Sequence, residues 1–328
     1  MKNSLFDRDQ LVLAPLGERE SLLDMSIISD LKAIPRNDIP SPLLEISKRI
    51  ITAKNKERAV ILMIGAHVIR SGVQRYLVDL MKRGYIRCLA MNGAGVIHDY
   101  EYALIGATTE SVATYIKSGQ FGLWKETGQI NDIINAAYHD DYQAGLGESM
   151  GKYILEQDFP NKSISLLANA CKYDVLPSIH VGIGYDIIHE HPNFNGAATG
   201  ALTYNDFLKF TRTVQDLENG VVMNFGSAIM APEVYLKALS MARNVARQKG
   251  NEIRHFSTLV CDLRSLPEIY RIEASKECAA YYFRPWKTML VRTVADGGES
   301  FYVNGRHAQT IPALWTAIGI AENEDCIS

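Results

Sequence analysis

A short stretch near the middle of the chain carries side chains of the kind that bind metal ions. His189, Glu190 and His191 are consecutive, and His180 precedes them. Imidazole and carboxylate groups are ligands for zinc and iron. Alternate residues of an extended strand share a face, so His189 and His191 can point the same way while Glu190 points the other way. Because no third spaced ligand accompanies that pair, the pattern favours hydrogen-bonded or substrate-facing histidines over a metal site.

Two loops rich in small residues offer a second kind of chemistry, the binding of a phosphorylated ligand. Gly65-Ala66-His67 follows one apolar run, and Asn92-Gly93-Ala94-Gly95 follows another. A loop without large side chains lets a ligand approach backbone N–H groups, and a helix N-terminus after the loop favours phosphate. Neither the G-x-G-x-x-G fingerprint nor the P-loop pattern G-x-x-x-x-G-K-[ST] occurs in the chain. A plain α/β crossover with glycines at tight turns is therefore the alternative interpretation.

The elements that hold these loops form a strand–helix–strand unit. Val60–Ile64 is a continuous apolar run, typical of a strand buried on both faces. From Ile69 the apolar residues recur with helical spacing as far as Met81, and Gly84 suits the left-handed cap of that helix. Ile86–Met91 is the next buried strand. Because open parallel sheets bind ligands at the carboxyl ends of their strands, both loops are expected at a binding site.

Strands and helices continue to alternate after this unit, which predicts an α/β, Rossmann-like, mostly parallel sheet with helices on both faces. Further strands are expected at Ile179–Gly184, Gly220–Phe225, Ile253–Val260, Thr288–Val294 and Ser300–Val303. Residues Ile105–Thr108 are expected to form a turn, and the small, polar segment Asn193–Gly200 a loop.

The 328 residues are expected to divide into three parts. Residues 1–45 contain Pro15, Pro35, Pro40 and Pro42 and show little periodicity, so we interpret them as an N-terminal arm that wraps the domain or a neighbouring subunit. Residues 46–320 are expected to form a single domain, and residues 321–328 a C-terminal tail.

The composition argues against several classes of function. A formal charge of -3, without a cluster of Lys and Arg, gives no support for nucleic-acid binding. No apolar run approaches the roughly 18 residues of a membrane span, and the N-terminus lacks the apolar core of a signal peptide. The cysteines are odd in number and form no C-x-x-C pair, so we expect free thiols in a reducing cytoplasm. They are Cys88, Cys171, Cys261, Cys278 and Cys326.

The two small-residue loops and their flanking residues resemble a known family, the deoxyhypusine synthases. Ala66-His67-Val68-Ile69-Arg70-Ser71-Gly72-Val73 is similar to the family's S-N-L-I-S-S-G-V block, and Asn92-Gly93-Ala94-Gly95-Val96-Ile97-His98-Asp99 to its T-A-G-G-V-E-E-D block. Weaker likenesses follow in the same order at Ile179–Asp186, Gly220–Ser227 and Phe301–Leu314. The resemblance covers roughly Val60 to Ile318. It implies an NAD-binding fold, usually in a homotetramer with the cofactor at subunit interfaces.

The resemblance also implies a set of cofactor contacts. Carried over residue by residue, NAD would contact Ala66, His67, Ile69, Ser71, Asn92, Gly93, Ala94, Asp186, Gly226 and Ser227. Small residues at strand ends admit a pyrophosphate, and the carboxylate of Asp186 can bind ribose hydroxyls. A solvated loop carboxylate is the alternative interpretation of Asp186.

The family's chemistry depends on a lysine that forms an imine with the butylamine group taken from spermidine. Lys287, in the run Arg284-Pro285-Trp286-Lys287, is the corresponding candidate, and a nearby guanidinium would lower its pKa. A surface lysine at the start of a strand is the alternative. Where the family has paired histidines, this chain has Ala231 and Pro232. This departure favours a divergent relative that acts on a small amine or amino acid. Candidate substrate-binding residues are His189, Glu233, Trp286 and Glu299.

The predicted function is therefore NAD-dependent oxidation of a small amine, a polyamine or a basic amino acid, to an imine, with transfer to a second amine through Lys287. One alternative keeps NAD and deaminates or cyclises an amino acid such as ornithine, as cyclodeaminases do. A second is a non-catalytic NAD-binding relative, and a third is a metal-dependent hydrolase built on the histidines. The expected partners are a small-molecule amine and further copies of the chain in a tetramer, with neither nucleic acid nor membrane.

Overall fold

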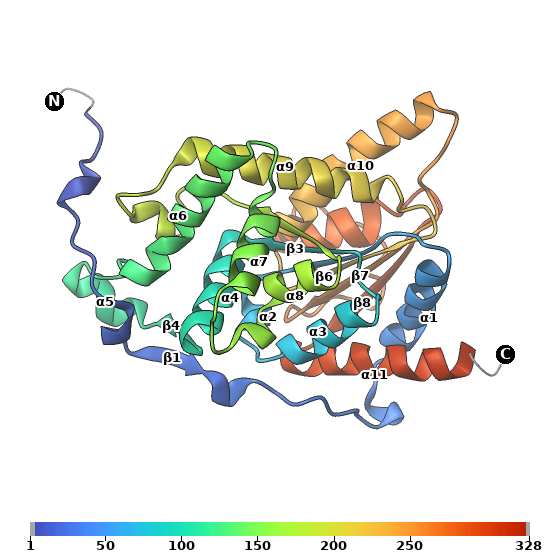
Figure 1. The fold of residues 1–328 in the computed structure, drawn as a ribbon. Coiled ribbons are helices and arrows are strands. Elements are labelled where there is room, and N and C mark those ends of the chain that lie inside the picture. The colour runs from blue at the N-terminus through green and yellow to red at the C-terminus, as the bar shows by residue number, and fades with distance from the viewer. Residues whose placement is uncertain (1–3, 326–328) are drawn as a thin grey trace.

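A six-stranded parallel sheet forms the centre of the molecule, in a computed structural model that describes residues 4–325 (Figure 1). Its strands are β2 (Val60–Ile64), β3 (Cys88–Asn92), β5 (Leu176–His180), β6 (Val221–Phe225), β7 (Ser257–Asp262) and β8 (Glu299–Asn304). They lie in the order β5-β3-β2-β6-β7-β8, and each neighbouring pair is parallel. Counted along the chain, this is the order 3-2-1-4-5-6 of the Rossmann fold. The predicted fold class is confirmed.

Helices cover both faces of the sheet (Figure 1). They are α1 (Ser41–Asn55), α2 (Ala66–Ile69), α3 (Gln74–Lys82), α4 (Gly93–Ile105), α5 (Val112–Ser118), α6 (Lys125–Asp140), α7 (Leu146–Glu156), α8 (Leu166–Lys172), α9 (Gly196–Val214), α10 (Met230–Gln248), a π-helix (Pro285–Arg292) and α11 (His307–Asp325). Among the described residues, no helix is both long and apolar enough to cross a lipid bilayer.

Alternation along the strands divides the hydrophobic core into two layers. In β2, Val60, Leu62 and Ile64 pack with the layer that includes α1, α3, α4 and α11. Ile61 and Met63 face the opposite layer, formed with α10 and the π-helix. All five residues are buried, which explains why the sequence shows an unbroken apolar run and not an alternating one.

The helix predicted from Ile69 to Met81 is divided in two. Its first turn is α2, and α3 starts at Gln74, because Gly72 between them adopts the left-handed conformation with φ +71°. A Cβ at Gly72 would overlap the carbonyl oxygen of Ile27, and the Gly72 carbonyl accepts the Ser29 N–H at 2.9 Å. Contact with the N-terminal arm, which no local pattern reveals, therefore explains the break.

Three further expectations were wrong. Residues Ile105–Thr108, predicted as a turn, contribute to β4 (Ala107–Glu110), which pairs antiparallel with β1 (Ser21–Asp24) of the arm. The segment Thr288–Val294, predicted as a strand, lies largely in the π-helix, whose buried side packs against β7. Asn193–Gly200, predicted as a loop, contains the start of α9, because Asn195 caps that helix by accepting the N–H groups of its second and third residues.

The two ends of the chain lie apart in the fold (Figure 1). Residues 4–40 run as an extended arm with short 3-10 turns and the strand β1. At the other end, residues 321–325, expected as a tail, continue α11. The remainder of that predicted tail, with Cys326, lies outside the described residues.

A buried carboxyl group joins three elements at the β5 side of the sheet. Asp206 of α9 accepts the N–H of Gly147, at the start of α7, at 2.9 Å and the N–H of Ile179, in β5, at 2.8 Å. Burial raises the pKa of Asp206 to about 7, although Lys209 nearby acts in the opposite direction. The folded state therefore binds the carboxyl proton of Asp206 more tightly than the unfolded state does.

Stability is expected to fall as the pH rises from about 4 to 7, because the folded protein must then give up the proton on Asp206 or bury its charge. Asp206→Asn keeps an acceptor oxygen and removes the titration. Urea unfolding of this variant at pH 5 and pH 8 should show a pH-dependent loss smaller than that of the wild type by about 2 kcal/mol. Asp216→Asn, at a half-exposed carboxylate paired with Arg212, is the matched control. Equal pH dependence in the wild type and Asp206→Asn would contradict this assignment.

Candidate functional site

The strand order reverses between β2 and β6, and the loops that follow these two strands are in close contact at the carboxyl ends of the strands. A Cβ added to Gly65, just after β2, would lie 2.5 Å from the carbonyl oxygen of Gly226, just after β6. Gly226 itself has φ +67°, and a Cβ there would overlap the imidazole of His307. Ligands of Rossmann sheets bind at such a reversal. The structure thus brings together the first predicted loop and the predicted residues Gly226 and Ser227.

Two imidazoles and a guanidinium line this part of the edge. His307, the first residue of α11, is buried, and its Nδ1 has no partner among the described residues. His67 Nε2 lies 3.2 Å from Nη1 of Arg70. Burial lowers the pKa of both His67 and His307, so neither ring carries a charge at neutral pH. Arg70 is the cation at this end of β2.

Two of the predicted cofactor contacts have other roles. Ile69 is fully buried in the core, and the hydroxyl of Ser71 donates to the carbonyl of His67 at 2.7 Å.

The second predicted loop is the N-terminus of α4, and two of its N–H groups already have side-chain partners. Asn92 caps the helix by accepting the Gly95 N–H at 3.2 Å. The carboxylate of Asp186 accepts the Ala94 N–H and lies so close that a Cβ at Gly93 would overlap it. Burial raises the pKa of Asp186 to about 6. The expected phosphate-binding turn therefore already contains a carboxylate, which leaves the Gly65 side of the edge for a phosphorylated ligand.

The histidine cluster supports the backbone around Asp186. Nδ1 of His189 accepts the N–H of Gly184 at 3.0 Å and the N–H of Asp186 at 3.1 Å, so its proton is on Nε2, 4.0 Å from Oδ2 of Asp186. His191 is buried with Nε2 2.8 Å from the carbonyl oxygen of Gly122. Within residues 4–325, no group of three or more metal-binding side chains gathers.

A cavity of about 210 Å³ opens beside Asp186, at the carboxyl ends of β3 and β5. Its charged and titratable lining residues are Arg19, Arg70, His98, Glu101, Glu110, Tyr185 and Asp186. Arg19 and Glu101 form an ion pair with only 1% of each side chain exposed, so their charges cancel. In the part of the chain that the structure describes, Arg70 has no carboxylate partner, and neither Glu110 nor Asp186 pairs with Lys or Arg.

Several features mark this cavity as a binding site. Thr109 has φ +68°, an unusual conformation for a β-branched residue, and its buried hydroxyl has no partner among the described residues. The buried Nε of Arg70 also lacks one. Glu110 accepts the Gly122 N–H and the indole N–H of Trp124, both at 3.0 Å, and burial raises its pKa. Strained and unsatisfied groups concentrate at functional sites.

Sequence reasoning missed most of this cavity. Arg19 comes from the arm, and Thr109 and Glu110 come from a strand that was expected to be a turn. One pattern does hint at the site: His98, Asp99 and Glu101 interrupt an otherwise apolar helix, and both carboxylates are buried.

The residues predicted for substrate chemistry around Lys287 do not line the cavity. The Lys287 ammonium lies 4.1 Å from the ring centroid of Tyr281. Trp286 is buried and donates to the carbonyl of Tyr270 at 2.5 Å. Glu233 pairs with Lys237 and with Arg284. The guanidinium predicted to lower the pKa of Lys287 is therefore engaged in an ion pair with Glu233.

Glu299 lies at the opposite edge of the sheet. It is the first residue of β8, whereas the cavity is at the carboxyl ends of the strands, and it pairs with Arg49 at 2.9 Å. The wrong strand prediction at 288–294 hid the fact that Glu299 and the cavity lie at opposite ends of the strands.

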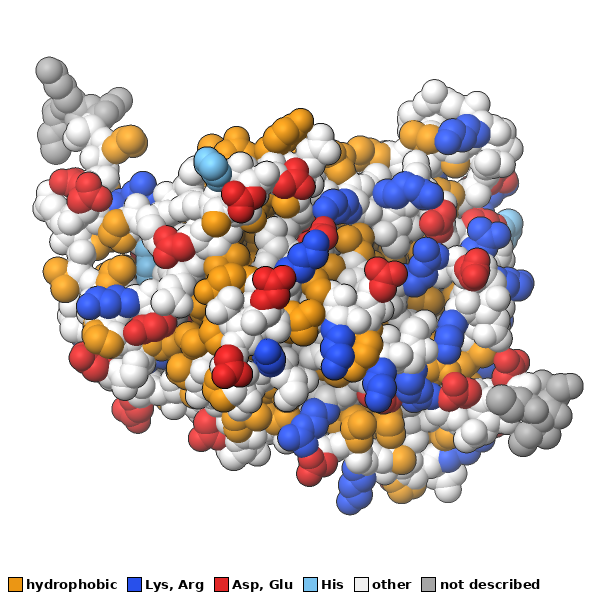
Figure 2. All heavy atoms as spheres, in the orientation of Figure 1, with side chains coloured by type: hydrophobic (Ala, Val, Ile, Leu, Met, Phe, Trp, Pro, Cys, Tyr) orange, Lys and Arg blue, Asp and Glu red, His pale blue; other side chains and the backbone are white. Residues whose placement is uncertain are grey.

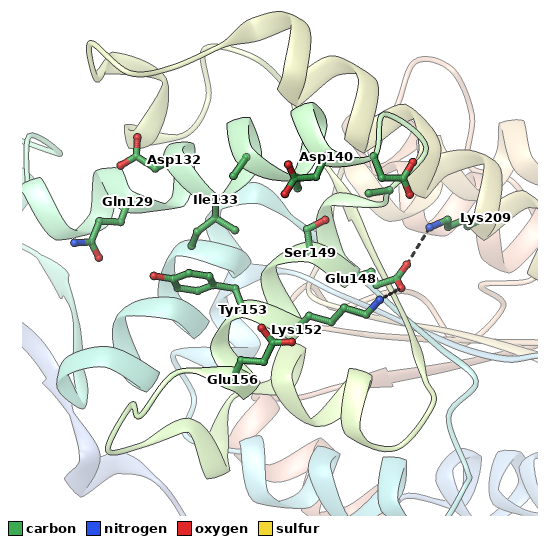
Figure 3. Close-up of a pocket in the computed structure, with 14 residues that line it drawn as sticks. Gln129, Asp132, Ile133, Asp140, Glu148, Ser149, Lys152, Tyr153, Glu156 and Lys209 are labelled. Atoms are coloured by element: carbon green, nitrogen blue, oxygen red, sulfur yellow. Dashed lines mark hydrogen bonds and ion pairs between the residues drawn. The ribbon is translucent and has the colours of Figure 1, made fainter.

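A larger groove of about 670 Å³ lies between α6, α7 and α9 (Figure 3). Its floor includes Ile133 and Tyr153, and Glu148 at its rim bonds to Lys152 at 2.6 Å and Lys209 at 3.1 Å (Figure 3). Acidic and basic side chains are mixed over this face of the molecule (Figure 2). None of the predicted cofactor contacts lines the groove. The smaller cavity at the strand ends is therefore the candidate site.

Comparison with known proteins points to the same region of the chain. Residues 44–139 match the sequence model of a family described as arginine dihydrolase ArgZ-like, C-terminal, Rossmann fold. The matched segment contains β2, β3 and α4, which carry the two loops. No curated protein matches the chain in sequence.

Solved structures with similar folds come from several groups. AgrE in complex with ornithine and NAD+ is 11% identical, with a TM-score of 0.50 over 89% of this chain and 35% of AgrE. A Methanococcus maripaludis S2 protein assigned to the LOR/SDH group is 15% identical, with a TM-score of 0.50 over 90% of this chain and 73% of its own. An Entamoeba histolytica protein assigned as a deoxyhypusine synthase is 11% identical, with a TM-score of 0.47 over 84% of this chain and 86% of its own.

These comparisons show the fold of the chain and how much of the compared proteins it spans. The chain spans about a third of the length of the ArgZ and AgrE chains that it matches. The predicted Rossmann-like fold is confirmed.

Proposed function

We propose that this protein is an NAD-dependent enzyme that oxidises the amine-bearing carbon of a small basic amino acid in the cavity beside Asp186. The observation that carries the proposal is the charge of that cavity. It combines one guanidinium without a carboxylate partner, Arg70, with two carboxyl groups, Glu110 and Asp186, that lack a cationic partner. Arg70 also connects the cavity to the loop after β2, since its Nη1 lies 3.2 Å from Nε2 of His67.

An amino acid carries the charges that complement this lining. Its carboxylate matches the planar guanidinium of Arg70, which can donate two hydrogen bonds to it. Its ammonium groups match the carboxyl groups of Asp186 and Glu110. A polyamine has ammonium groups but offers nothing to Arg70. This difference favours a basic amino acid over a polyamine, and it agrees with the presence of ornithine in the AgrE complex.

We place the dinucleotide over the loops after β2 and β6, because the strand order reverses there and Rossmann sheets bind ligands at such a reversal. Gly65 and Gly226 carry no side chains, and Ala66, His67 and Ser227 are their neighbours in the chain. These residues would hold NAD, and Asp186 lines the substrate cavity. When bound, NAD supplies a hydride acceptor for the carbon that bears the amine.

Transfer to a second amine through Lys287 is not part of the proposal, because that ammonium lies on Tyr281 and does not line the cavity. The tetrameric assembly and the cytoplasmic location stay predictions.

Thermal unfolding and NADH absorbance test the proposal. NAD should raise the unfolding temperature, since a ligand at a hundred times its dissociation constant adds roughly 2.7 kcal/mol to the folded state. Ornithine and related basic amino acids should then produce NADH, whereas spermidine and putrescine should not. Absence of any NAD effect, or turnover of polyamines only, would refute the proposal.

Arg70→Gln should raise the KM for the amino acid by about 10- to 100-fold, because a charge-assisted hydrogen bond contributes about 1.5–3 kcal/mol. The stabilisation by NAD should not change. Arg75→Gln is the matched control, since Arg75 is a half-exposed arginine paired with Asp30. Equal KM values for Arg70→Gln and the control would remove Arg70 from the substrate site.

A further inference from the structure

A chain of buried hydrogen bonds connects the N-terminal arm to one imidazole of the cavity. Nδ1 of His98 lies 2.8 Å from the hydroxyl of Thr108. That hydroxyl donates to Oε2 of Glu101 at 2.6 Å. Glu101 also accepts two hydrogen bonds from Arg19, at 2.8 and 2.9 Å, and one from Thr127 at 2.7 Å.

The chain of donors fixes where the proton of His98 lies. Glu101 is a carboxylate paired with Arg19, so it can only accept hydrogen bonds. The single hydroxyl proton of Thr108 therefore points to Glu101, and its oxygen must accept from His98. Nδ1 of His98 carries the proton, and Nε2 has a free lone pair. Because the ring lines the cavity, this lone pair is the basic nitrogen beside Arg70 and Asp186.

The surroundings keep the ring neutral. Burial, together with Arg70, His67 and Arg19, lowers the pKa of His98 to about 4, although Glu101 acts in the opposite direction. Glu110, Tyr185 and Asp186 complete the titratable groups of the cavity. A base this weak cannot readily deprotonate an alkylammonium ion. The ring is basic enough to take a proton from a water molecule that bonds to an electron-poor carbon, because that bond makes the water strongly acidic.

We infer that His98 is the catalytic base that activates water against the oxidised substrate, so that the enzyme releases a carbonyl compound and ammonia and forms no new bond to a second amine. This inference rests on the proposed function and deepens it.

The water oxygen forms a bond to the iminium carbon, and the π electron pair of the C=N bond moves to nitrogen. The O–H bond of the water breaks, its electron pair stays on oxygen, and the proton goes to Nε2 of His98. A neutral carbinolamine and an imidazolium result, and Glu101 stabilises the imidazolium through Thr108. The imidazolium then gives its proton to the carbinolamine nitrogen. The C–N bond breaks with its electron pair on nitrogen, which leaves as ammonia, while the hydroxyl group gives its proton to Nε2 and the C=O bond forms. His98 finally releases that proton to solvent.

The first test needs no substrate. Long-range proton–nitrogen NMR spectra of the histidine rings, assigned with His98→Asn, should show His98 at neutral pH as the neutral form protonated on Nδ1. Thr108→Val, which keeps the shape of the side chain and removes the hydroxyl, should shift the ring toward the other tautomer. A wild-type ring protonated on Nε2 or on both nitrogens would overturn the inference.

The second test separates the two chemical stages in a rapid-quench single turnover with NAD+ and ornithine. Asn places an amide N–H where His has Nδ1–H, so His98→Asn can keep the bond to Thr108 while losing the base. NADH formation should stay within about threefold of the wild type, and ammonia release should slow by about 100-fold or more. Thr108→Val should slow ammonia release by about tenfold. His139→Gln, at an exposed histidine, is the control and should change neither rate.

The outcomes distinguish this inference from the proposed function. If the wild type forms no NADH with any amino acid, the proposed function fails, whatever the tautomer of His98. If the wild type turns over but His98→Asn releases ammonia at the wild-type rate, the inference fails alone. It also fails if His98→Asn and Thr108→Val lose NADH formation and ammonia release equally, because the ring would then act before water enters.

Discussion

Replacing Arg19 by Met is expected to lower the free energy of unfolding by about 4 kcal/mol. Glu101 would remain in the core with its charge unmatched, because only 1% of its side chain is exposed and Arg19 is its one ion-pair partner in the described chain. Removing one member of a buried pair costs about 3–5 kcal/mol, since the remaining charge can neither reach water nor find another cation. Urea unfolding at neutral pH measures the loss.

A surface pair provides the control for Arg19. Arg36 pairs with Glu324 at 2.7 Å, with about half of each side chain exposed. Arg36→Met should change stability by less than about 1 kcal/mol, because water and salt screen that pair. Adding Glu101→Gln to Arg19→Met should recover part of the loss, since a neutral amide is less costly to bury. A loss as small as that of Arg36→Met would mean that water reaches Glu101 in solution.

Gly226→Ala is expected to abolish the stabilisation by NAD and to destabilise the free protein by about 3 kcal/mol. The left-handed backbone at φ +67° costs a residue with a Cβ about 1–2 kcal/mol. The added methyl would also overlap the buried ring of His307, which must shift at a cost of about 1–3 kcal/mol. Both effects act at the end of β6, where Gly226 lies in close contact with Gly65 and His307. Thermal unfolding with and without NAD measures them together.

Gly200→Ala provides the matched glycine control. Gly200 lies inside α9 with no atom within 4 Å of the position of a Cβ, so this change should raise stability by up to about 1 kcal/mol and leave the response to NAD intact. Gly65→Ala tests the same pair of loops from the other strand, since its Cβ would lie 2.5 Å from the Gly226 carbonyl oxygen. If Gly226→Ala responds to NAD as the wild type does, the cofactor does not bind at these loops.

The sequence predicted the fold where local pattern and final structure have the same cause. Val60–Ile64 is a strand with the predicted bounds because it is buried on both faces, and burial on both faces leaves an unbroken apolar run. Gly84 was predicted to end a helix in the left-handed region and does so with φ +72°. Both inferences depend on neighbours within a few residues.

The sequence-based predictions were wrong where contacts between distant parts of the chain determine the local structure. The residues at 288–294 include four β-branched side chains, which suit a strand, yet they pack mainly as a helix against β7. β4 exists because the arm provides its partner strand. The cavity also depends on the arm, since Arg19 pairs with Glu101, which lies 82 positions further along the chain. Spacing along the chain cannot reveal such a pair.

The pairing of β1 with β4 has a consequence for the order in which the protein is made. Ser21 is paired with Glu110, and Asp24 with Ala107. During synthesis the arm leaves the ribosome well before its partner strand. Its side chains, among them Arg19, Leu22 and Leu23, therefore stay exposed to solvent while the central unit is still being translated. Exposed strand edges of this kind attract chaperones and other chains. The arm can therefore take its place beside the cavity only after its partner strand has been synthesised.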